Sequence, residues 1–577
     1  MRALLIGLLL IHLFLPAGDL QWPLKGEPGL SASFTEYRGS RFHMGLDLST
    51  GGVEGLNVFP VQDGTIFKVR STELGYGNSI YIRHANGHIS VYAHLAQFGE
   101  KILSRLRAMK VNLNTYFGTK ELNLPVSKDD CIAFSGESGS GPAHLHFEIR
   151  DKDNRPLSPV DAGLKLGKNY QETLVVKAIR ISPLTADGTV NGGKFPYVCT
   201  DFSRPIQASG KIGLEMMGYV QLPNGNRMGF TEVAILVNGK EREGWHPQVL
   251  SYSYYRQSHK VYNRFYSGFG PTQYVYRFNH LSDPGIPGFR FSGPVVVDQA
   301  VQLDIQLKGM KSERLIQLNL KQDAVRNTTN SSHFVNIVPD FDMSHGRVRY
   351  KLHSTGQTQI RALKPAMILP MSKDAPVNLL GRLPEQANQP FQFGKWNITS
   401  SKPTRLVACK QIQTPRKGLQ KLSTALIFEN CGQPAARLSV SWSPPEGTKN
   451  MHQLGFYTWS ANRKKWSFNQ PYRQNRGQIK LPFFTVCTVL RDTGQPTIGK
   501  ISSHSYFTGR KRVVRIRDKQ SGIDWDRVSF FMKGKHAPLE KDRDRGWIIL
   551  PDKLHFPIRI DVVDKAGNRA SKVFKSL

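Results

Sequence analysis

The chain has 577 residues, which excludes a single small fold and predicts about three to five domains of ordinary size. Hydrophobic residues make up 39% of it, enough to build packed cores, so global disorder is excluded. Nearly all of the net charge of +34 lies in residues 166–577, because residues 1–165 hold 17 basic and 16 acidic side chains. We therefore expect a nearly neutral N-terminal module followed by a basic region, whose charge favours a polyanionic partner.

The first residues have the pattern of a signal peptide. Arg2 is followed by an apolar run at 3–16 and by two small residues before the polar Asp19. The run is shorter than the roughly 20 residues that span a bilayer, so a permanent membrane helix is the weaker alternative. We expect a signal peptide at 1–18 and no transmembrane segment after its removal. Export places the chain in the periplasm, in the cell envelope or outside the cell, and argues against nucleic acid as a partner.

Strand patterns begin soon after this segment. Between residues 59 and 95, short runs rich in Ile, Val and Tyr alternate with turns, which predicts antiparallel strands. The pairs Asp63-Gly64 and Asn86-Gly87 are typical of hairpin turns. A helix is expected only at Glu100–Lys110, where apolar residues fall at helical spacing.

The remainder of the chain is also predicted to be mainly β. From residue 173 onward, short apolar runs are separated by Gly, Pro, Asn and Asp, a pattern typical of tandem β-sandwiches. We expect an antiparallel β-sheet domain at 19–170, a β-sandwich at 171–325, one or more β-rich domains at 326–495 and a terminal β domain at 496–577.

Histidine is concentrated in the N-terminal module. The pairs His43/Asp47 and His144/His146 have even spacings, so along extended strands each pair would point to one face and could converge on one ion. Zinc binds imidazole nitrogen and carboxylate oxygen, and hydrolytic sites use three protein ligands. Further histidines beside the ion could perform acid–base work. Each motif alone is more often plain surface polarity, and spacing leaves open which histidines are ligands.

Four ordered sequence blocks within residues 32–162 favour a metal site over plain surface polarity. They are RGSRFHMGLDLST at 38–50, FPVQDGTIFKV at 59–69, GYGNSIYIRHANGHISVYAHL at 75–95 and SGESGSGPAHLHFEIR at 135–150. Together they resemble the lysostaphin/LytM-type zinc metalloendopeptidases, metallopeptidase family 23, which cut peptide cross-links in bacterial peptidoglycan.

The resemblance implies a LytM-like catalytic domain with one Zn²⁺ per chain. It assigns His43, Asp47 and His146 as the zinc ligands and His94 and His144 as the catalytic pair. It implies a zinc metalloendopeptidase of the peptidoglycan DD-endopeptidase type, whose partners are peptidoglycan stem peptides. The chain departs from the family pattern by an Ala between Pro142 and His144. His84 and His88 are expected to be satisfied polar residues at a hairpin.

Two other functional classes stay open. One is a catalytically inactive LytM-like envelope protein that binds the cell wall and activates another hydrolase. The other is an adhesin or scaffold whose β domains bind a partner. The end of the chain, with IRIDVVDKAGNRASK at 558–572, resembles bacterial Ig-like modules. We expect the basic C-terminal domains to attract anionic envelope polymers.

Overall fold

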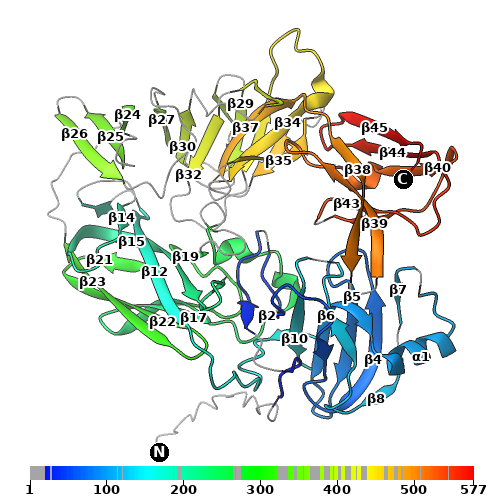
Figure 1. Ribbon diagram of the computed structural model, residues 1–577. Helices are drawn as coiled ribbons and strands as arrows, with labels where there is room; N and C mark the ends of the chain where they lie inside the picture. The colour runs from blue at the N-terminus through cyan, green and yellow to red at the C-terminus, as the bar shows by residue number, and fades with distance from the viewer. Residues whose placement is uncertain are drawn as a thin grey trace, which may run out of the picture.

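The structure is a computed structural model that describes residues 20–576 with short gaps, wider between 323 and 437, where mainly the strands are described (Figure 1). The expected signal peptide at 1–18 lies outside the described residues. The chain is mainly β, as predicted. No helix in the described part has the length and apolar character that a bilayer crossing requires.

The N-terminal region forms one antiparallel sheet, with the central order β1-β2-β10-β6-β5-β4-β7. Strand β10 lies between β2 and β6, so segments about 100 residues apart in sequence become neighbours. The strands are β1 (Leu30–Ala32), β2 (Leu46–Ser49), β3 (Asn57–Val58), β4 (Gly64–Ser71), β5 (Asn78–Arg83), β6 (Ile89–Phe98), β7 (Phe117–Gly118), β8 (Leu124–Val126), β9 (Ala133–Ser135), β10 (His144–Arg150) and β11 (Pro156–Leu157).

The local predictions for this region have different outcomes. Helix α1 (Glu100–Ala108) is confirmed, and it buries Ile102 and Leu106. The Asn86-Gly87 hairpin is confirmed, because β5 and β6 pair across that turn. The Asp63-Gly64 hairpin is wrong: β3 pairs with β9, while β4 pairs with β5, β7 and β8. Pairing between segments far apart in the sequence therefore decides the partners of these strands.

The second region is a sheet centred on the long strand β15, with the order β14-β12-β15-β23-β22-β17-β18-β20. Its buried residues and those of the N-terminal sheet form one continuous hydrophobic core. The two regions therefore support each other. The strands are β12 (Thr173–Pro183), β13 (Thr189–Val190), β14 (Tyr197–Cys199), β15 (Ile206–Gln221), β16 (Arg227–Met228), β17 (Glu232–Val237), β18 (Lys240–Trp245), β19 (Tyr274–Phe278), β20 (Phe289–Phe291), β21 (Val295–Val297), β22 (Val301–Lys308) and β23 (Glu313–Gln322).

The rest of the described chain forms five antiparallel sheets, and the division into domains stays a prediction. The first holds β24 (Asn336–Asp342), β25 (Arg347–Ser354) and β26 (Gln357–Leu363). The second holds β27 (Val377–Arg382), β30 (Arg405–Cys409), β31 (Leu419–Lys421), β32 (Ala425–Glu429), β34 (Leu454–Ser460), β35 (Lys465–Pro471) and β37 (Thr485–Asp492). The third holds β28 (Pro390–Phe393), β29 (Trp396–Ser400), β33 (Leu438–Trp442) and β36 (Gln478–Leu481).

The last two sheets make up the C-terminal region. One holds β38 (Thr497–Tyr506), β39 (Gly509–Arg517), β42 (Glu540–Asp542) and β43 (Trp547–Ile549). The other holds β40 (Ser529–Met532), β41 (Lys535–His536), β44 (Ile558–Val563) and β45 (Arg569–Phe574). The two share a core that includes Val514, Phe530 and Ile560. This paired-sheet arrangement suits the expected β-sandwich, while the Ig-like assignment stays a prediction.

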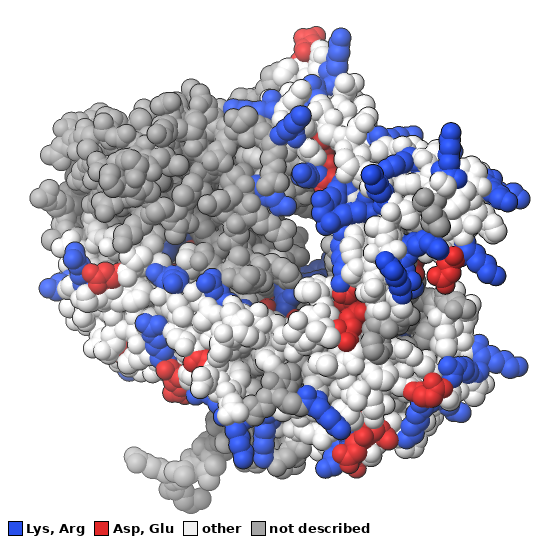
Figure 2. All heavy atoms as spheres, in the orientation of Figure 1, with Lys and Arg blue, Asp and Glu red and all other residues white. Residues whose placement is uncertain are grey.

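The C-terminal region returns to the N-terminal sheet (Figure 1). Arg543 pairs with Glu73 at 3.2 Å, and Arg545 pairs with Glu137. Both acidic residues lie on loops of the N-terminal region. Figure 2 shows many Lys and Arg side chains over the C-terminal strands, with acidic side chains where they face the N-terminal sheet.

Candidate metal centre

Three neighbouring strands position the candidate residues. Strand β10 pairs with β2 so that His146 is opposite Asp47, and it pairs with β6 so that His146 is opposite Ala93. His144 and His146 lie two residues apart on β10, so both side chains point to the same face, as predicted.

His43 reaches the site differently from the prediction. The expectation of one extended strand through His43 and Asp47 is wrong, because β2 begins only at Leu46 and His43 lies on the segment before it. Gly45 explains why the chain can pass here: a Cβ at this position would lie 2.3 Å from the carbonyl oxygen of Phe147. The two backbones therefore approach each other closely, and this approach brings His43 next to His146 on β10.

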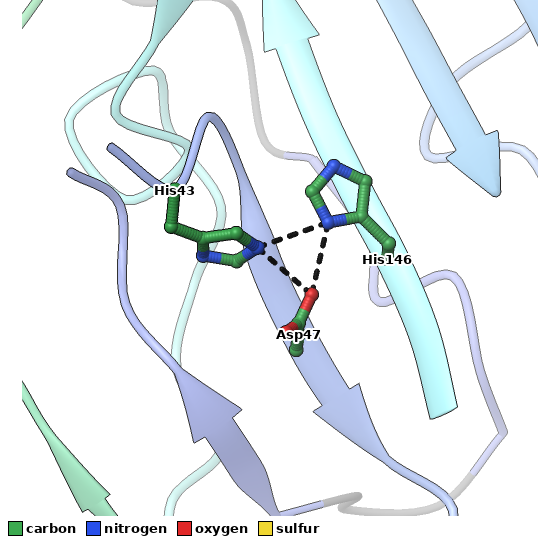
Figure 3. A group of neighbouring side chains, drawn as sticks. All are labelled: His43, Asp47 and His146. Atoms are coloured by element: carbon green, nitrogen blue, oxygen red, sulfur yellow. Dashed lines mark hydrogen bonds and ion pairs between the residues drawn. The ribbon is translucent and has the colours of Figure 1, made fainter. Parts of the chain in front are cut away.

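One donor atom from each of His43, Asp47 and His146 forms a corner of a small triangle (Figure 3). The Nε2 atom of His43 lies 3.0 Å from Nδ1 of His146 and 3.0 Å from Oδ1 of Asp47. The same Asp47 oxygen lies 2.9 Å from His146 Nδ1. Ligands of a tetrahedral zinc ion, at bond lengths of about 2.0–2.1 Å, are separated by about 3.3 Å. The observed triangle fits such an ion after opening by a few tenths of an ångström, and the three side chains could hold a metal ion.

A second partner orients each of these side chains. His43 donates Nδ1–H to the carbonyl of Ser33 at 2.8 Å, which leaves its Nε2 lone pair for an ion. Arg38 donates to the other Asp47 oxygen at 2.6 Å. Burial alone would raise the pKa of the Asp47 carboxyl, but His43, His144 and Arg38 hold this pKa well below its ordinary value. The carboxylate is therefore ionised and ready to bind a cation.

Glu148 is the second partner of His146. His146 donates Nε2–H to Glu148 at 2.9 Å, so its Nδ1 atom points to the triangle. Burial would lower the pKa of His146, but its bonds to Asp47 and Glu148 outweigh this and raise the pKa to about 9. Glu148 in turn accepts bonds from Arg150 at 2.7 Å and from Tyr252 at 3.0 Å. Tyr252 belongs to the short 3₁₀ helix η1 (Tyr252–Tyr254), beyond the N-terminal sheet, so the second region completes this network.

His94 and His144 flank the triangle as a pair. Their ring centroids are 4.6 Å apart, and His144 Nε2 lies 3.7 Å from Asp47 Oδ1. His94 donates Nδ1–H to the carbonyl of Ser138 at 2.9 Å, and His144 donates Nδ1–H to the carbonyl of Pro142 at 2.7 Å. A carbonyl can only accept, so in each ring Nε2 carries the lone pair.

Burial keeps both rings neutral. It is the main cause that lowers the pKa of His94, and any positive charge on His144 or His146 would lower it further. Burial likewise lowers the pKa of His144. Two neutral imidazoles with free Nε2 lone pairs are suited to accept a proton.

A β-bulge holds His94 in place. Ile80 on β5 is opposite Tyr92 on β6, and Asn78 is opposite Leu95, so β6 has one extra residue between these two pairs. Within this bulge His94 adopts a left-handed φ of 62°. A non-glycine residue in this conformation costs about 1–3 kcal/mol, which the surrounding sheet must offset. Bulges of this kind re-aim side chains beside functional sites.

The structure brings all five predicted residues together and shows partners that the sequence reading missed. Glu148 could have been found, because it continues the period of two after His144 and His146. Arg38 and Tyr252 had no comparable local signal. His84 is satisfied as expected, since its ring nitrogens bond to Asp63 and Ser90. For His88 the expectation is wrong, because its Nδ1 is buried without a hydrogen-bond partner in the described structure.

The antiparallel sheet and its buried His-Asp-His group are consistent with a metallopeptidase domain. The chain contains a LytM-type domain of Peptidase family M23, whose family model matches residues 41–110. The match covers part of the chain, so it describes the N-terminal region.

Curated relatives are similar to part of the chain. The chain is 35% identical over 127 residues to "DD-carboxypeptidase/endopeptidase Mpg" of Neisseria meningitidis serogroup B, covering 22% of this chain and 23% of that protein. It is 27% identical over 137 residues to "Murein hydrolase activator NlpD" of Escherichia coli K12, covering 24% and 29%. The chain thus spans about a quarter of the length of these curated relatives. A solved zinc-containing peptidase from Vibrio cholerae is 23% identical, with 26% of this chain and 40% of that chain covered and a TM-score of 0.19.

Proposed function

We propose that the chain is an exported zinc metalloendopeptidase that hydrolyses peptide cross-links of bacterial peptidoglycan in the periplasm or cell envelope. The observation that carries this proposal is the convergence of three donor atoms within 3.0 Å of one another beside two neutral histidines. The relative named as a DD-carboxypeptidase/endopeptidase supports the substrate class. The bond between D-alanine and diaminopimelate is our first choice, and a glycyl bridge is the alternative.

The side chains divide the work of peptide hydrolysis. His43, Asp47 and His146 would hold the zinc ion, which would supply the Lewis acidity that activates water and polarises a carbonyl. His94 and His144 accept the water proton on a free Nε2 and pass a proton to the departing amine. The protonated ring also stabilises negative charge on the carbonyl oxygen. Ser138 and Pro142 keep the two rings in the tautomer that this work requires.

A catalytically inactive activator of another hydrolase is the second candidate. It is favoured by the relative named as a murein hydrolase activator. The geometry favours the active enzyme, because an activator needs neither three converging metal donors nor the fixed tautomers of His94 and His144. Both candidates would act in the cell envelope.

Chelation separates these functions. We expect the full-length chain to cleave the cross-links of diaminopimelate-type sacculi, so that later muramidase digestion yields uncross-linked muropeptides. This activity should be lost with a chelator and regained with Zn²⁺. Chromatography and mass spectrometry of the products identify the bond, and sacculi with glycyl bridges serve as the matched substrate. A chain that releases nothing from either, yet stimulates a second murein hydrolase, would establish the activator function instead.

The basic C-terminal regions are proposed to hold the enzyme on anionic envelope polymers. The Debye length, beyond which the attraction between exposed charges is largely screened, is about 10 Å at 0.1 M salt and about 3 Å at 1 M. We therefore expect the fraction of full-length His144→Ala protein that cosediments with sacculi to fall several-fold between these salt concentrations. Binding that stays constant would exclude an electrostatic anchor. Sacculi freed of covalently attached anionic polymers test whether stem-peptide carboxylates suffice.

A further inference from the structure

Three aspartates meet at the junction between the second of the five C-terminal sheets and the terminal sheet pair. Asp492 ends β37, Asp518 directly follows β39 and Asp564 directly follows β44. One carboxylate oxygen of each lies within 4.8 Å of the other two. Asp492 and Asp564 have exposed fractions of 0%, and Asp518 is partly buried. The cluster is therefore largely enclosed by protein.

No basic side chain in the described part of the chain forms an ion pair with these three carboxylates. Backbone N–H groups hold their orientation: Gly494 donates to Asp492 at 2.9 Å, and Asn568 donates to Asp564 at 2.8 Å. These bonds leave up to three negative charges close together. Burial and the charges of its neighbours raise the pKa of Asp492 to about 6, although two backbone N–H bonds oppose the rise. A cation would remove this repulsion.

Two buried polar atoms of this junction, one of them in the cluster itself, have no hydrogen-bond partner in the described structure. Oδ1 of Asp518 is buried and accepts no hydrogen bond within the described structure. The hydroxyl of Tyr457 on β34 is also buried and unpartnered there, and the side chain has an exposed fraction of 0%. Burial and then the charges of all three aspartates raise the pKa of this hydroxyl, so all three carboxylates act on it. A buried orphan oxygen requires an explanation, and an ion is one.

We propose that Asp492, Asp518 and Asp564 bind a Ca²⁺ ion that ties the terminal sheet pair to the preceding sheet. All of the candidate donors are oxygen atoms, which excludes the nitrogen and sulfur chemistry that zinc prefers. Calcium accepts carboxylates, hydroxyls and carbonyls in flexible arrangements of six to eight oxygens, while magnesium demands a stricter octahedron. The donors here come from the ends of three strands in three different sheets, which suits the more tolerant ion. This site is separate from the histidine centre.

The ion would reinforce a junction that few direct bonds hold. Asn568 donates to the carbonyl of Asp492 at 3.2 Å, and Gln453 donates to Asn568 at 2.9 Å. An ion bound by residues of all three sheets stabilises their joined state by mass action.

Terbium luminescence and calorimetry on the full-length, zinc-loaded chain test the proposal. We expect saturable binding of about one Ca²⁺ per chain, Tb³⁺ emission excited through Tyr457, and displacement of Tb³⁺ by Ca²⁺ at far lower concentrations than by Mg²⁺. Asp518→Asn should weaken Ca²⁺ binding at least tenfold, and Tyr457→Phe should reduce the tyrosine-excited emission. Bound zinc should stay unchanged in both variants.

Asp561→Asn is the matched control. Asp561 lies on β44 three residues before Asp564, but its carboxylate already pairs with Arg559 at 3.2 Å. Its Ca²⁺ affinity should equal that of the unchanged chain, and circular dichroism without Ca²⁺ should show all variants folded. Absence of saturable binding, equal affinity for Mg²⁺, or equal affinity in Asp518→Asn and Asp561→Asn would each overturn the assignment.

Discussion

Replacing His146 by Ala is expected to remove both the bound zinc and the hydrolysis of peptide cross-links. His146 supplies one of only three side-chain donors, and its Nδ1 atom lies within 3.0 Å of the other two. The remaining pair of donors cannot complete a stable zinc shell, which needs three protein ligands in a hydrolytic site. Metal analysis of the purified variant should find less than a tenth of the zinc of the unchanged chain, and cleavage of cross-links should fall to background.

The comparison requires a variant that removes a histidine elsewhere in the same sheet. His88→Ala is suited, because His88 lies in the β5–β6 turn and takes no part in the cluster of Figure 3. It should keep full zinc content and activity. Circular dichroism distinguishes loss of the ion from loss of the fold. A folded His146→Ala protein that retains stoichiometric zinc would show that the metal site lies elsewhere.

Much of the fold follows from local patterns in the sequence. The period of two places His144 and His146 on one face of β10, and Asn86-Gly87 marks the turn between β5 and β6. Helical spacing identifies α1 (Glu100–Ala108) as well. These features depend on neighbours in the chain, so a single sequence contains them. The mainly β class follows by the same reasoning.

The errors at Asp63-Gly64 and at His43 have one physical origin, which is contact between distant segments. Asp63-Gly64 looks like a hairpin turn, yet β3 finds its partner in β9. His43 meets His146 across 103 positions, and the approach depends on the missing side chain of Gly45. Spacing could not distinguish ligands from catalytic residues, and only the resemblance to a family gave an assignment.

The outer partners of the site show the same limit more strongly. Tyr252 lies 104 positions from Glu148, on a segment that local patterns assign to a different domain. The shared hydrophobic core of the two regions explains why such a residue can be held in place. Mutation of a residue that hydrogen-bonds to a metal ligand typically lowers metal affinity or activity by about 10–100-fold. We therefore expect the metal site to depend on the second region as well as on the N-terminal sheet.

Replacing His144 by Ala is expected to separate the two properties that His146→Ala loses together: the variant should retain zinc and lose turnover. His144 Nε2 lies 3.7 Å from Asp47 Oδ1, beside the donor triangle but outside it. The three donors keep their own partners Ser33, Arg38 and Glu148. General acid–base groups contribute about 10²–10⁴-fold to rate, so kcat should fall by about that factor while zinc content stays unchanged.

The ratio of the two effects separates the possible roles of His144. Loss of zinc in His144→Ala would make this residue a ligand, and normal cleavage would remove it from the mechanism. His94→Ala should behave in the same way, because the two rings lie 4.6 Å apart and share the proton transfers. If they act as one unit, the double variant should be little slower than either single variant, since removing one partner already disables the pair.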